Sequence, residues 1–261
     1  MRILAITNQK GGVGKTTTCV NLAASLAATR RRVLLIDLDP QGNATTGSGI
    51  DKTAMKQTIY HVLIGDKTLK EVMQSSIKGK FDVIPANREL AGAEVELVNE
   101  IARETRLKVA LAELGDSYDY VLIDCPPALN LITVNALTAA HAVMIPMQCE
   151  YYALEGLSDL INTIKKVRAH LNPGLEIEGL LRTLFDNRNV LAQQVSAELA
   201  QHFGDKVYRT VIPRNIRLAE APSYGVPVLF HDKASKGAQA YLALAGEIIN
   251  RAVLNAIVVN G

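Results

Sequence analysis

Lys10-Gly11-Gly12-Val13-Gly14-Lys15-Thr16-Thr17 is the stretch that decides the fold of this chain. It follows the short apolar run Ile3–Thr7, which is typical of a buried parallel strand, and it precedes Cys19–Ala28, whose pattern predicts a helix. Glycines between a strand and a helix let successive backbone N–H groups point at an anion, and the helix start adds the positive end of its dipole. The stretch therefore predicts a loop that binds the phosphates of a nucleoside triphosphate.

Two side chains of this loop have chemical tasks at such a site. Lys15 would reach the β- and γ-phosphates, and the hydroxyl of Thr16 would hold Mg²⁺. The common form of the motif is G-x-x-x-x-G-K-[ST], and Gln9 stands where its first glycine would be. The loop is therefore a variant of the common motif.

A dinucleotide-binding turn is the alternative reading of the same glycines. Gly12 and Gly14 are followed by the acidic Asp37, as in half of that fingerprint. The fingerprint, however, needs a small residue where Thr17 stands, and it gives no role to Lys15. We therefore predict a triphosphate site.

Length and composition narrow the class of protein. With 261 residues and 48% hydrophobic content, the chain is expected to form one domain over residues 1–261. Its net charge of +2 indicates no nucleic-acid partner by itself, so any such surface must be a local patch. Cys19, Cys125 and Cys149 show no C-x-x-C spacing, which argues against a disulfide framework or a zinc site. No signal-peptide layout follows Met1 and no apolar run reaches ~18 residues, so we expect a cytoplasmic protein.

Strand and helix patterns alternate almost to the end of the chain. This order predicts an α/β fold with a doubly wound, mostly parallel sheet flanked by helices. The expected strands are Arg2–Thr7, Val33–Asp37, Phe81–Pro85, Tyr120–Asp124, Ala142–Pro146, Ile177–Phe185 and Lys206–Ile212. The expected helices are Thr16–Thr29, Thr58–Ile64, Leu90–Val95, Glu100–Leu114, Leu131–Ala139, Ala153–Leu171, Leu191–Phe203 and Gly237–Val253. The connections Pro40–Thr58 and Arg214–Ser235 are long enough to suggest functional loops.

Two of the predicted strands end in acids. Val33–Ile36 leads to Asp37 and Asp39, and Tyr120–Ile123 leads to Asp124. Ligands gather at the carboxyl ends of strands in open α/β sheets, and alternation puts Asp37 and Asp39 on the same side. One of these two carboxylates can orient the Mg²⁺ shell while the other faces the attacking water, and Asp124 follows the Walker B pattern of a metal-supporting acid. The alternative for Asp37 and Asp39 is a pair of helix-capping or solvated aspartates.

Several segments together resemble the ParA/Soj family of chromosome- and plasmid-partitioning ATPases, whose deviant Walker A motif is K-G-G-x-G-K-[ST]-T. The matching segments are Asn8–Thr17, Asp37–Asn43, Asp124–Pro127, Ile212–Asn215 and Glu220–Ser223. The last two point to the Soj-like branch. The resemblance covers nearly the whole chain, and it implies the P-loop NTPase fold of the deviant Walker A type.

The resemblance also implies roles for individual residues. Lys10 would cross a dimer interface to the partner's phosphates, acting in catalysis with Lys15, and Asp39 would lie next to the hydrolytic water. The nucleotide would be bound by Lys10, Gly11, Gly12, Val13, Gly14, Lys15, Thr16 and Thr17, with Pro213, Arg214 and Asn215 bordering the adenine. The expected Mg²⁺ site consists of Thr16, Asp37 and Asp124.

The family implies a function as well as a site. It implies an ATPase of weak intrinsic activity that uses ATP and Mg²⁺ and forms a sandwich dimer on binding ATP. The dimer would bind double-stranded DNA without sequence preference, which would associate the protein with the nucleoid. A ParB-type centromere-binding protein would stimulate hydrolysis and so release the dimer.

Two other functions are alternatives to partitioning. A MinD-like, membrane-associated ATPase that regulates septum placement would end in a basic amphipathic helix. Ile248–Val259 carries one charge and no aromatic residue, so we expect a packed terminal helix, a frayed tail and no membrane binding. A metabolic P-loop kinase would need an acceptor site, and Pro40–Thr58 offers hydroxyls but no clear acceptor pocket.

Arginines cluster in two places. Arg30–Arg32 closes the first predicted helix, where cations complement the helix dipole. Between Leu180 and Leu218 the arginines lie largely at loop ends rather than at helical spacing from acids, so we expect them to be free to meet phosphates. No aromatic residues interleave with them, which favours the backbone of duplex DNA over stacked single strands. A merely solvated basic face is the alternative, and the family resemblance favours Arg188 and Arg217 as DNA contacts.

Overall fold

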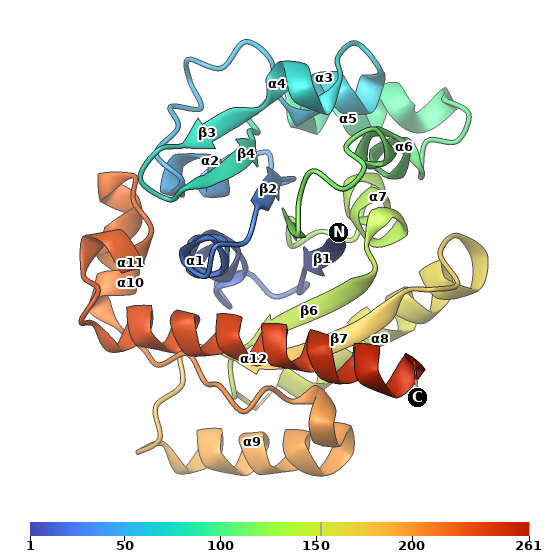
Figure 1. The fold of residues 1–261 in the computed structure, drawn as a ribbon. Helices are drawn as coiled ribbons and strands as arrows, with labels where there is room; N and C mark the ends of the chain where they lie inside the picture. Colours follow the sequence, from blue (N-terminus) through green and yellow to red (C-terminus); the bar gives the residue numbers. More distant parts are fainter. Residues whose placement is uncertain (152, 261) are drawn as a thin grey trace.

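The computed structural model describes residues 1–151 and 153–260 (Figure 1). The strands within these ranges are β1 (Arg2–Ile6), β2 (Val33–Asp37), β3 (Gln74–Ser76), β4 (Phe81–Ile84), β5 (Tyr120–Asp124), β6 (Ala142–Met147) and β7 (Glu176–Arg182). They form one seven-stranded sheet in the order β3-β4-β2-β5-β1-β6-β7. Every neighbouring pair is parallel except β3 with β4. The predicted doubly wound, mostly parallel fold is confirmed.

Helices cover both faces of the sheet. On one face α1 (Lys15–Ala28) packs against α12 (Lys236–Asn260), and Figure 1 shows α1 end-on beside β1 and β2 with α12 crossing below it. The other face is covered mainly by α3 (Ile59–Ile64), α5 (Leu90–Glu96), α6 (Arg106–Ala112), α7 (Leu131–Ala139) and α8 (Ala153–His170). The remaining helices are α2 (Asn43–Gly47), α4 (Leu69–Val72), η1 (Leu97–Asn99), α9 (Val190–Phe203), η2 (Gly204–Lys206), α10 (Ile216–Glu220), η3 (Ala221–Tyr224) and α11 (Val228–His231).

The apolar strands follow from this layering. In β1, Ile3 and Ala5 join the hydrophobic cluster on one face, and Leu4 and Ile6 join the cluster on the other. A strand that is buried on both faces needs apolar side chains at successive positions. The central strands therefore do not alternate between apolar and polar residues. Burying each leucine or isoleucine contributes roughly 1.5–3 kcal/mol. In the central strands β1, β2 and β5 the charged side chains are therefore confined to the strand ends.

The predicted strand Lys206–Ile212 is wrong. Among the described residues, this segment forms one isolated bridge, between Leu180 and Val207, and a second bridge joins Phe185 to Pro213, just after the segment. The reason is a side chain of α12. The Glu247 carboxylate accepts the two backbone N–H groups that a neighbouring strand would otherwise have to bind. These bonds come from Arg209 at 2.8 Å and Thr210 at 2.9 Å.

Other boundaries also differ from the prediction. The helix expected over Glu100–Leu114 begins only at Arg106, because Ala102 adopts a left-handed conformation with φ 57° that interrupts any helix. The last helix continues to Asn260, past the expected end at Val253, so the expected frayed tail is also wrong. The short elements β3, α2, α4, α10 and α11 were not predicted, because they are too short to show a period. Among the described residues, no helix is long and apolar enough to cross a membrane.

Arg30–Arg32 follow the end of α1, as expected. The N–H of Arg30 donates to Ala27 at 2.9 Å and that of Arg31 donates to Leu26 at 3.3 Å. Arg30 has φ 65°, the left-handed conformation that usually ends a helix and that favours glycine. These bonds satisfy carbonyl groups that the helix leaves unpaired, so the helix-terminus interpretation is confirmed.

Candidate functional site

Three central strands bring the predicted site together at their carboxyl ends. β5 lies between β1 and β2, with Asp124 in register with Ile6 on one side and with Asp37 on the other. The glycine-rich loop leaves directly from the end of β1. The loop and the two buried aspartates therefore share one edge of the sheet, where α/β proteins bind their ligands.

The loop between β1 and α1 needs its glycines for conformational reasons. Gly12 has φ 73° and Gly14 has φ 84°, both in the left-handed region. Gly14 is the N-cap of α1 and no side chain caps this helix, so the first N–H groups of α1 have no side-chain acceptor. Unpaired N–H groups and a helix dipole make this terminus a ready site for a phosphate group.

Two side chains outside the glycines hold the loop in shape. The Asn8 side chain accepts the N–H of Lys10 at 3.0 Å and donates to the Pro146 carbonyl at 2.8 Å. The Thr183 hydroxyl, at the end of β7, donates to the Val13 carbonyl at 2.7 Å. Sequence reasoning gave Thr183 no role, because nothing in the local pattern links it to a loop 170 residues earlier.

The two lysines of the loop differ in environment. Lys15 is only 7% exposed, and its Nζ donates to the Lys10 carbonyl at 3.0 Å. Burial lowers the pKa of Lys15, and the nearby charges of Asp124 and Asp39 oppose that shift. Lys10 is exposed and its ammonium group pairs with Glu150 at 2.5 Å. Lys15 is therefore held inside the loop, whereas Lys10 stands at the surface.

The two buried aspartates also differ, although they are neighbours. Asp37 accepts hydrogen bonds from the Thr45 N–H at 2.8 Å, the Thr45 hydroxyl at 2.7 Å and the Asp39 N–H at 3.1 Å. Asp124 is fully buried, and neither of its oxygens has a hydrogen-bond partner within the described residues. Burial raises the pKa of both acids, but the hydrogen bonds to Asp37 oppose the rise, whereas the charge of Asp37 adds to the rise at Asp124. Asp37 is therefore satisfied by hydrogen bonds within the described part of the fold, whereas Asp124 is not.

An unpartnered buried carboxylate is what a hard cation needs. Asp124 faces Thr16, whose hydroxyl opposes the rise in the Asp124 pKa. Oxygen ligands of this kind suit Mg²⁺, which keeps several waters and uses one or two carboxylates together with nucleotide phosphates. The residues present therefore fit a Mg²⁺ ion beside the loop.

The alternative interpretations of the aspartates were partly right. Asp37 does cap a helix, because Thr45 is the third residue of α2 and donates its N–H to Asp37. The solvated interpretation is wrong for Asp37, which is fully buried. Asp39 is half-buried, and its Oδ1 accepts the Gln41 N–H at 2.9 Å, so its position in the loop is defined.

Asp124→Asn is expected to make the metal-free protein more stable at high pH. The folded chain raises the pKa of Asp124 above its ordinary value of about 4, so the stability of the wild type falls as pH rises towards the folded pKa. Asparagine removes this loss, so its advantage over the wild type should grow as the pH rises above about 4, the ordinary pKa of an aspartate. Urea unfolding in EDTA measures the difference.

Asp119→Asn is the matched control for this experiment. Asp119 lies just before β5, and the Arg32 side chain lowers its pKa rather than raising it. Its asparagine variant should therefore gain nothing over the wild type as pH rises. An Asp124→Asn protein with the same pH dependence as the wild type would contradict the burial of a titrating carboxylate.

The turn predicted to border the adenine is hydrogen-bonded to the segment that contacts the phosphate loop. The Phe185 N–H donates to Ile212 at 3.0 Å, and the Arg214 N–H donates back to Phe185 at 3.3 Å. Phe185 is two residues beyond Thr183, which contacts the phosphate loop. Asn215 caps α10 by accepting the Leu218 N–H at 3.3 Å. The turn is thus tied to the segment that touches the loop, and its adenine contact stays a prediction.

The expectation of free arginines is wrong for Arg188 and Arg217. The Arg188 side chain is 87% exposed and pairs with Asp186 through two bonds of 3.0 and 2.7 Å. Arg217 pairs with Glu220 at 2.8 Å and with Asp232 at 3.3 Å. These acids lie two, three and fifteen residues away, so a search for helical spacing misses most of them.

Arg182 is a structural residue rather than a surface one. It is half-buried and donates to the Ser196 hydroxyl at 2.8 Å and the Tyr208 carbonyl at 2.7 Å. These bonds join β7 to α9 and to the segment that follows it. The Arg182 guanidinium is therefore engaged within the protein.

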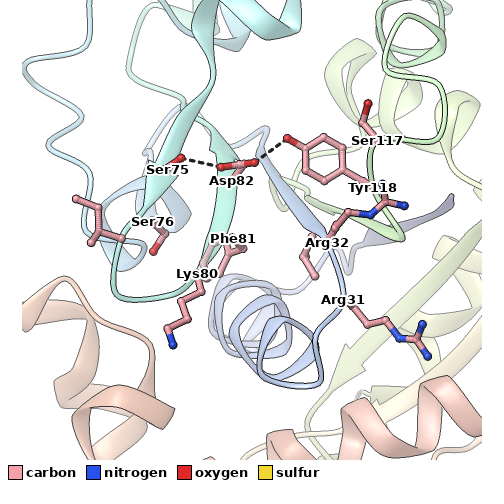
Figure 2. A pocket seen from close by; sticks show the side chains of 11 residues that line it. Arg31, Arg32, Ser75, Ser76, Lys80, Phe81, Asp82, Ser117 and Tyr118 are labelled. Carbon is pink, nitrogen blue, oxygen red and sulfur yellow. Dashed lines mark hydrogen bonds between the residues drawn. The ribbon is translucent and has the colours of Figure 1, made fainter.

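A pocket of about 460 Å³ opens at the opposite edge of the sheet (Figure 2). It lies at the amino ends of the strands, where Val33 begins β2 and Phe81 begins β4. Figure 2 shows Asp82 accepting bonds from the Ser75 hydroxyl at 2.7 Å and the Tyr118 hydroxyl at 2.8 Å. Both carboxylate oxygens thus have partners, and the pocket is no part of the site beside the phosphate loop.

Comparison with known proteins places these features in context. Residues 1–177 match a family model described as an AAA domain. The chain is 56% identical to the sporulation initiation inhibitor protein Soj of Bacillus subtilis, over 95% of this chain and 98% of Soj. It is 54% identical to the chromosome partitioning protein ParA of Caulobacter vibrioides, over 96% of this chain and 95% of that protein. A solved structure of cobyrinic acid a,c-diamide synthase from Mycobacterium smegmatis, with bound ADP and magnesium, has a TM-score of 0.83 and 39% identity, covering 94% of this chain and 93% of that one.

Proposed function

Because this chain belongs to the ParA/Soj family of chromosome-partitioning ATPases, we propose that its ATP-bound form is a sandwich dimer that coats duplex DNA and leaves it after hydrolysis. ATP and Mg²⁺ are its cofactors, and its reaction is the transfer of a phosphoryl group to water. The observation that carries the proposal is the pair of lysines in one loop, Lys15 buried and Lys10 exposed. A nucleotide site within one subunit would need only the buried lysine, so the exposed lysine is available to contact the nucleotide of a second subunit.

The nucleotide half of the proposal assigns one task to each side chain. Lys15 holds the β- and γ-phosphates, and the N–H groups at the start of α1 surround them. Thr16 and Asp124 hold Mg²⁺, supported by Asp37, and the ion when bound neutralises charge on the phosphate oxygens. Asp39 orients the attacking water. Since Lys10 acts on the partner's nucleotide, the monomer has an incomplete site, and we expect its intrinsic turnover to be slow.

Lys10→Ala is expected to bind ATP as the wild type does but to remain monomeric with ATP. The reason is that Lys10 reaches away from the buried lysine of its own loop, and in the dimer it would contact the other subunit's phosphates. Light scattering with a non-hydrolysable ATP analogue measures the mass, and calorimetry measures the affinity.

The matched control is Glu150→Gln, which removes the partner of Lys10 and keeps the lysine. This variant should dimerise at least as well as the wild type, because it releases the ammonium group. A Lys10→Ala protein that forms an ATP-dependent dimer would show that the lysine acts only within its own subunit.

The DNA half of the proposal concerns the segments before α9 and along α10. Arg188 and Arg217 are exposed there, and the Phe185–Pro213 bridge joins the two segments. A dimer would double the number of such arginines, and neutralising more phosphates releases more counterions. We therefore expect ATP to raise the affinity for duplex DNA steeply, with no preference for sequence.

Arg188→Ala is expected to weaken DNA binding while ATP binding and dimerisation stay unchanged. Removing one arginine from each subunit deletes about two phosphate contacts per dimer, so the slope of log affinity against log salt should shrink by roughly 1.8. Arg217→Ala should behave similarly. Fluorescence anisotropy on two unrelated duplexes at several salt concentrations measures the slope, and loss on one sequence alone would indicate base recognition instead.

The direct test of the proposed function is co-sedimentation with DNA in the presence of ATP or ADP. DNA binding with ATP and not with ADP would support partitioning through the nucleoid, and equal binding would oppose it. We further propose that a ParB-type protein stimulates hydrolysis, which phosphate release with and without that protein would test. The MinD-like alternative predicts sedimentation with liposomes and ATP. The names of the relatives at 54–56% identity favour partitioning over it.

A further inference from the structure

Carboxylates accompany the exposed arginines of this surface. Arg188, Arg214 and Arg217 are exposed on it, and three carboxylates accompany them, those of Asp186, Glu220 and Asp232. Asp186 interacts with Arg188 directly and is close enough to Arg214 for that charge to act on it. An anionic polymer that approaches these three arginines therefore also meets three carboxylates beside them.

The pairing at Arg188 is built into a turn. Asp186 Oδ1 accepts both the backbone N–H and the Nε–H of Arg188 at 3.0 Å, and Oδ2 accepts a third bond at 2.7 Å. Arg188 holds the pKa of Asp186 at about 2, so the acid is ionised at neutral pH. The bidentate geometry is the one that a guanidinium also uses on a phosphate group. Carboxylate and phosphate therefore compete for the same edge of Arg188.

The pairing at Arg217 uses two acids. Glu220 lies one turn further along α10, and Asp232 reaches across from the end of α11. His231 lies 3.6 Å from the same Glu220 carboxylate and stacks on Tyr224, which fixes that end of the cluster. Arg217 thus pairs with one more acid than Arg188 does. Replacing either of its two acids leaves Arg217 paired with the other.

We propose that Asp186, Glu220 and Asp232 are latches, which neutralise the DNA-facing arginines while the protein is off DNA and so limit its affinity for duplex. The inference rests on the proposed function, because it takes Arg188 and Arg217 as phosphate contacts. An exposed ion pair in water is weak, so phosphates of a duplex can displace the carboxylates when a dimer presents several arginines at once. Binding then depends more steeply on dimerisation than free arginines would allow.

The test is the affinity of Asp186→Asn for a labelled duplex, with a non-hydrolysable ATP analogue. Asparagine keeps the Oδ1 acceptor for the Arg188 N–H, so the turn is preserved while the charge is lost. Arg188 contacts phosphate in both proteins, so the salt slope should change little, whereas the affinity should rise roughly 5- to 30-fold because two exposed ion pairs per dimer no longer have to be broken. Glu220→Gln should gain less, since Asp232 still holds Arg217.

Two further variants distinguish the release of a paired arginine from the general effect of removing one negative charge. Glu198→Gln removes one exposed acid from α9 that pairs with neither arginine, and it should raise affinity by no more than about twofold. In Asp186→Asn/Arg188→Ala the gain should vanish, leaving the affinity of Arg188→Ala alone. If Arg188→Ala weakens DNA binding but Asp186→Asn and Glu198→Gln have the same affinity for DNA, the latch proposal is wrong and the proposed DNA-binding surface is retained. If Arg188→Ala has no effect, the DNA surface and the latch are both wrong.

Discussion

Replacing Lys15 with alanine is expected to lower the affinity for ATP by roughly 100- to 1,000-fold, or about 3–4 kcal/mol. Lys15 is the buried cation of the phosphate loop, and bonds from an ammonium group to phosphate oxygens are among the stronger hydrogen bonds in proteins. The loop N–H groups would remain, but they carry only partial charges. Isothermal titration calorimetry with ATP and Mg²⁺ measures the loss directly.

Lys10→Ala is the natural control for this experiment, since it removes a lysine from the same loop. Lys10 is exposed and pairs with Glu150, so its loss should leave the affinity of a subunit for ATP almost unchanged. Thermal unfolding without nucleotide should show that Lys15→Ala is folded, because that variant loses only the bond to the Lys10 carbonyl. Wild-type affinity in Lys15→Ala would remove the basis for the phosphate-loop assignment.

Asp39→Asn is expected to slow ATP hydrolysis by roughly 100- to 1,000-fold while ATP binding and dimerisation persist. The magnitude is that of losing a positioned acid or base at a reacting water. Asparagine keeps the acceptor for the Gln41 N–H, so the loop geometry is preserved and only the basic group is lost. With hydrolysis blocked, the dimer should stay on DNA. Phosphate release measures the rate, and anisotropy measures the time spent on DNA.

Asp51→Asn is the control for Asp39→Asn. Asp51 lies in the same long connection but is exposed and bonds only to its own turn at Thr53 and Ala54. Its variant should hydrolyse ATP at the wild-type rate. A rate in Asp39→Asn within threefold of the wild type would assign the water to another group.

The nucleotide half of the molecule could be predicted from local pattern. The glycine spacing, the apolar strands and the acids that end them each depend on a few consecutive residues, and backbone sterics turn such patterns into geometry. This is why the sequence predicted that Asp37 and Asp124 lie at one edge of the sheet, and β5 places them in register. The difference between them was not predictable, because it depends on Thr45, which α2 brings back to Asp37.

The features that the sequence did not predict depend on contacts between segments that are distant along the chain. The hydroxyl that holds the phosphate loop comes from Thr183, and the acid that replaces a strand at Arg209 and Thr210 comes from Glu247. The third acid of the arginine surface, Asp232, reaches Arg217 only because α11 packs beside α10.

The parallel strands β1, β2 and β4–β7, the phosphate loop and the chemistry of phosphate binding thus follow from local sequence, because they depend on backbone geometry and residue type over short spans. Only the tertiary structure decided which charges are free. Whether a side chain is exposed, paired or buried depends on the segments that packing brings beside it, and a short-range pattern carries no information on those neighbours.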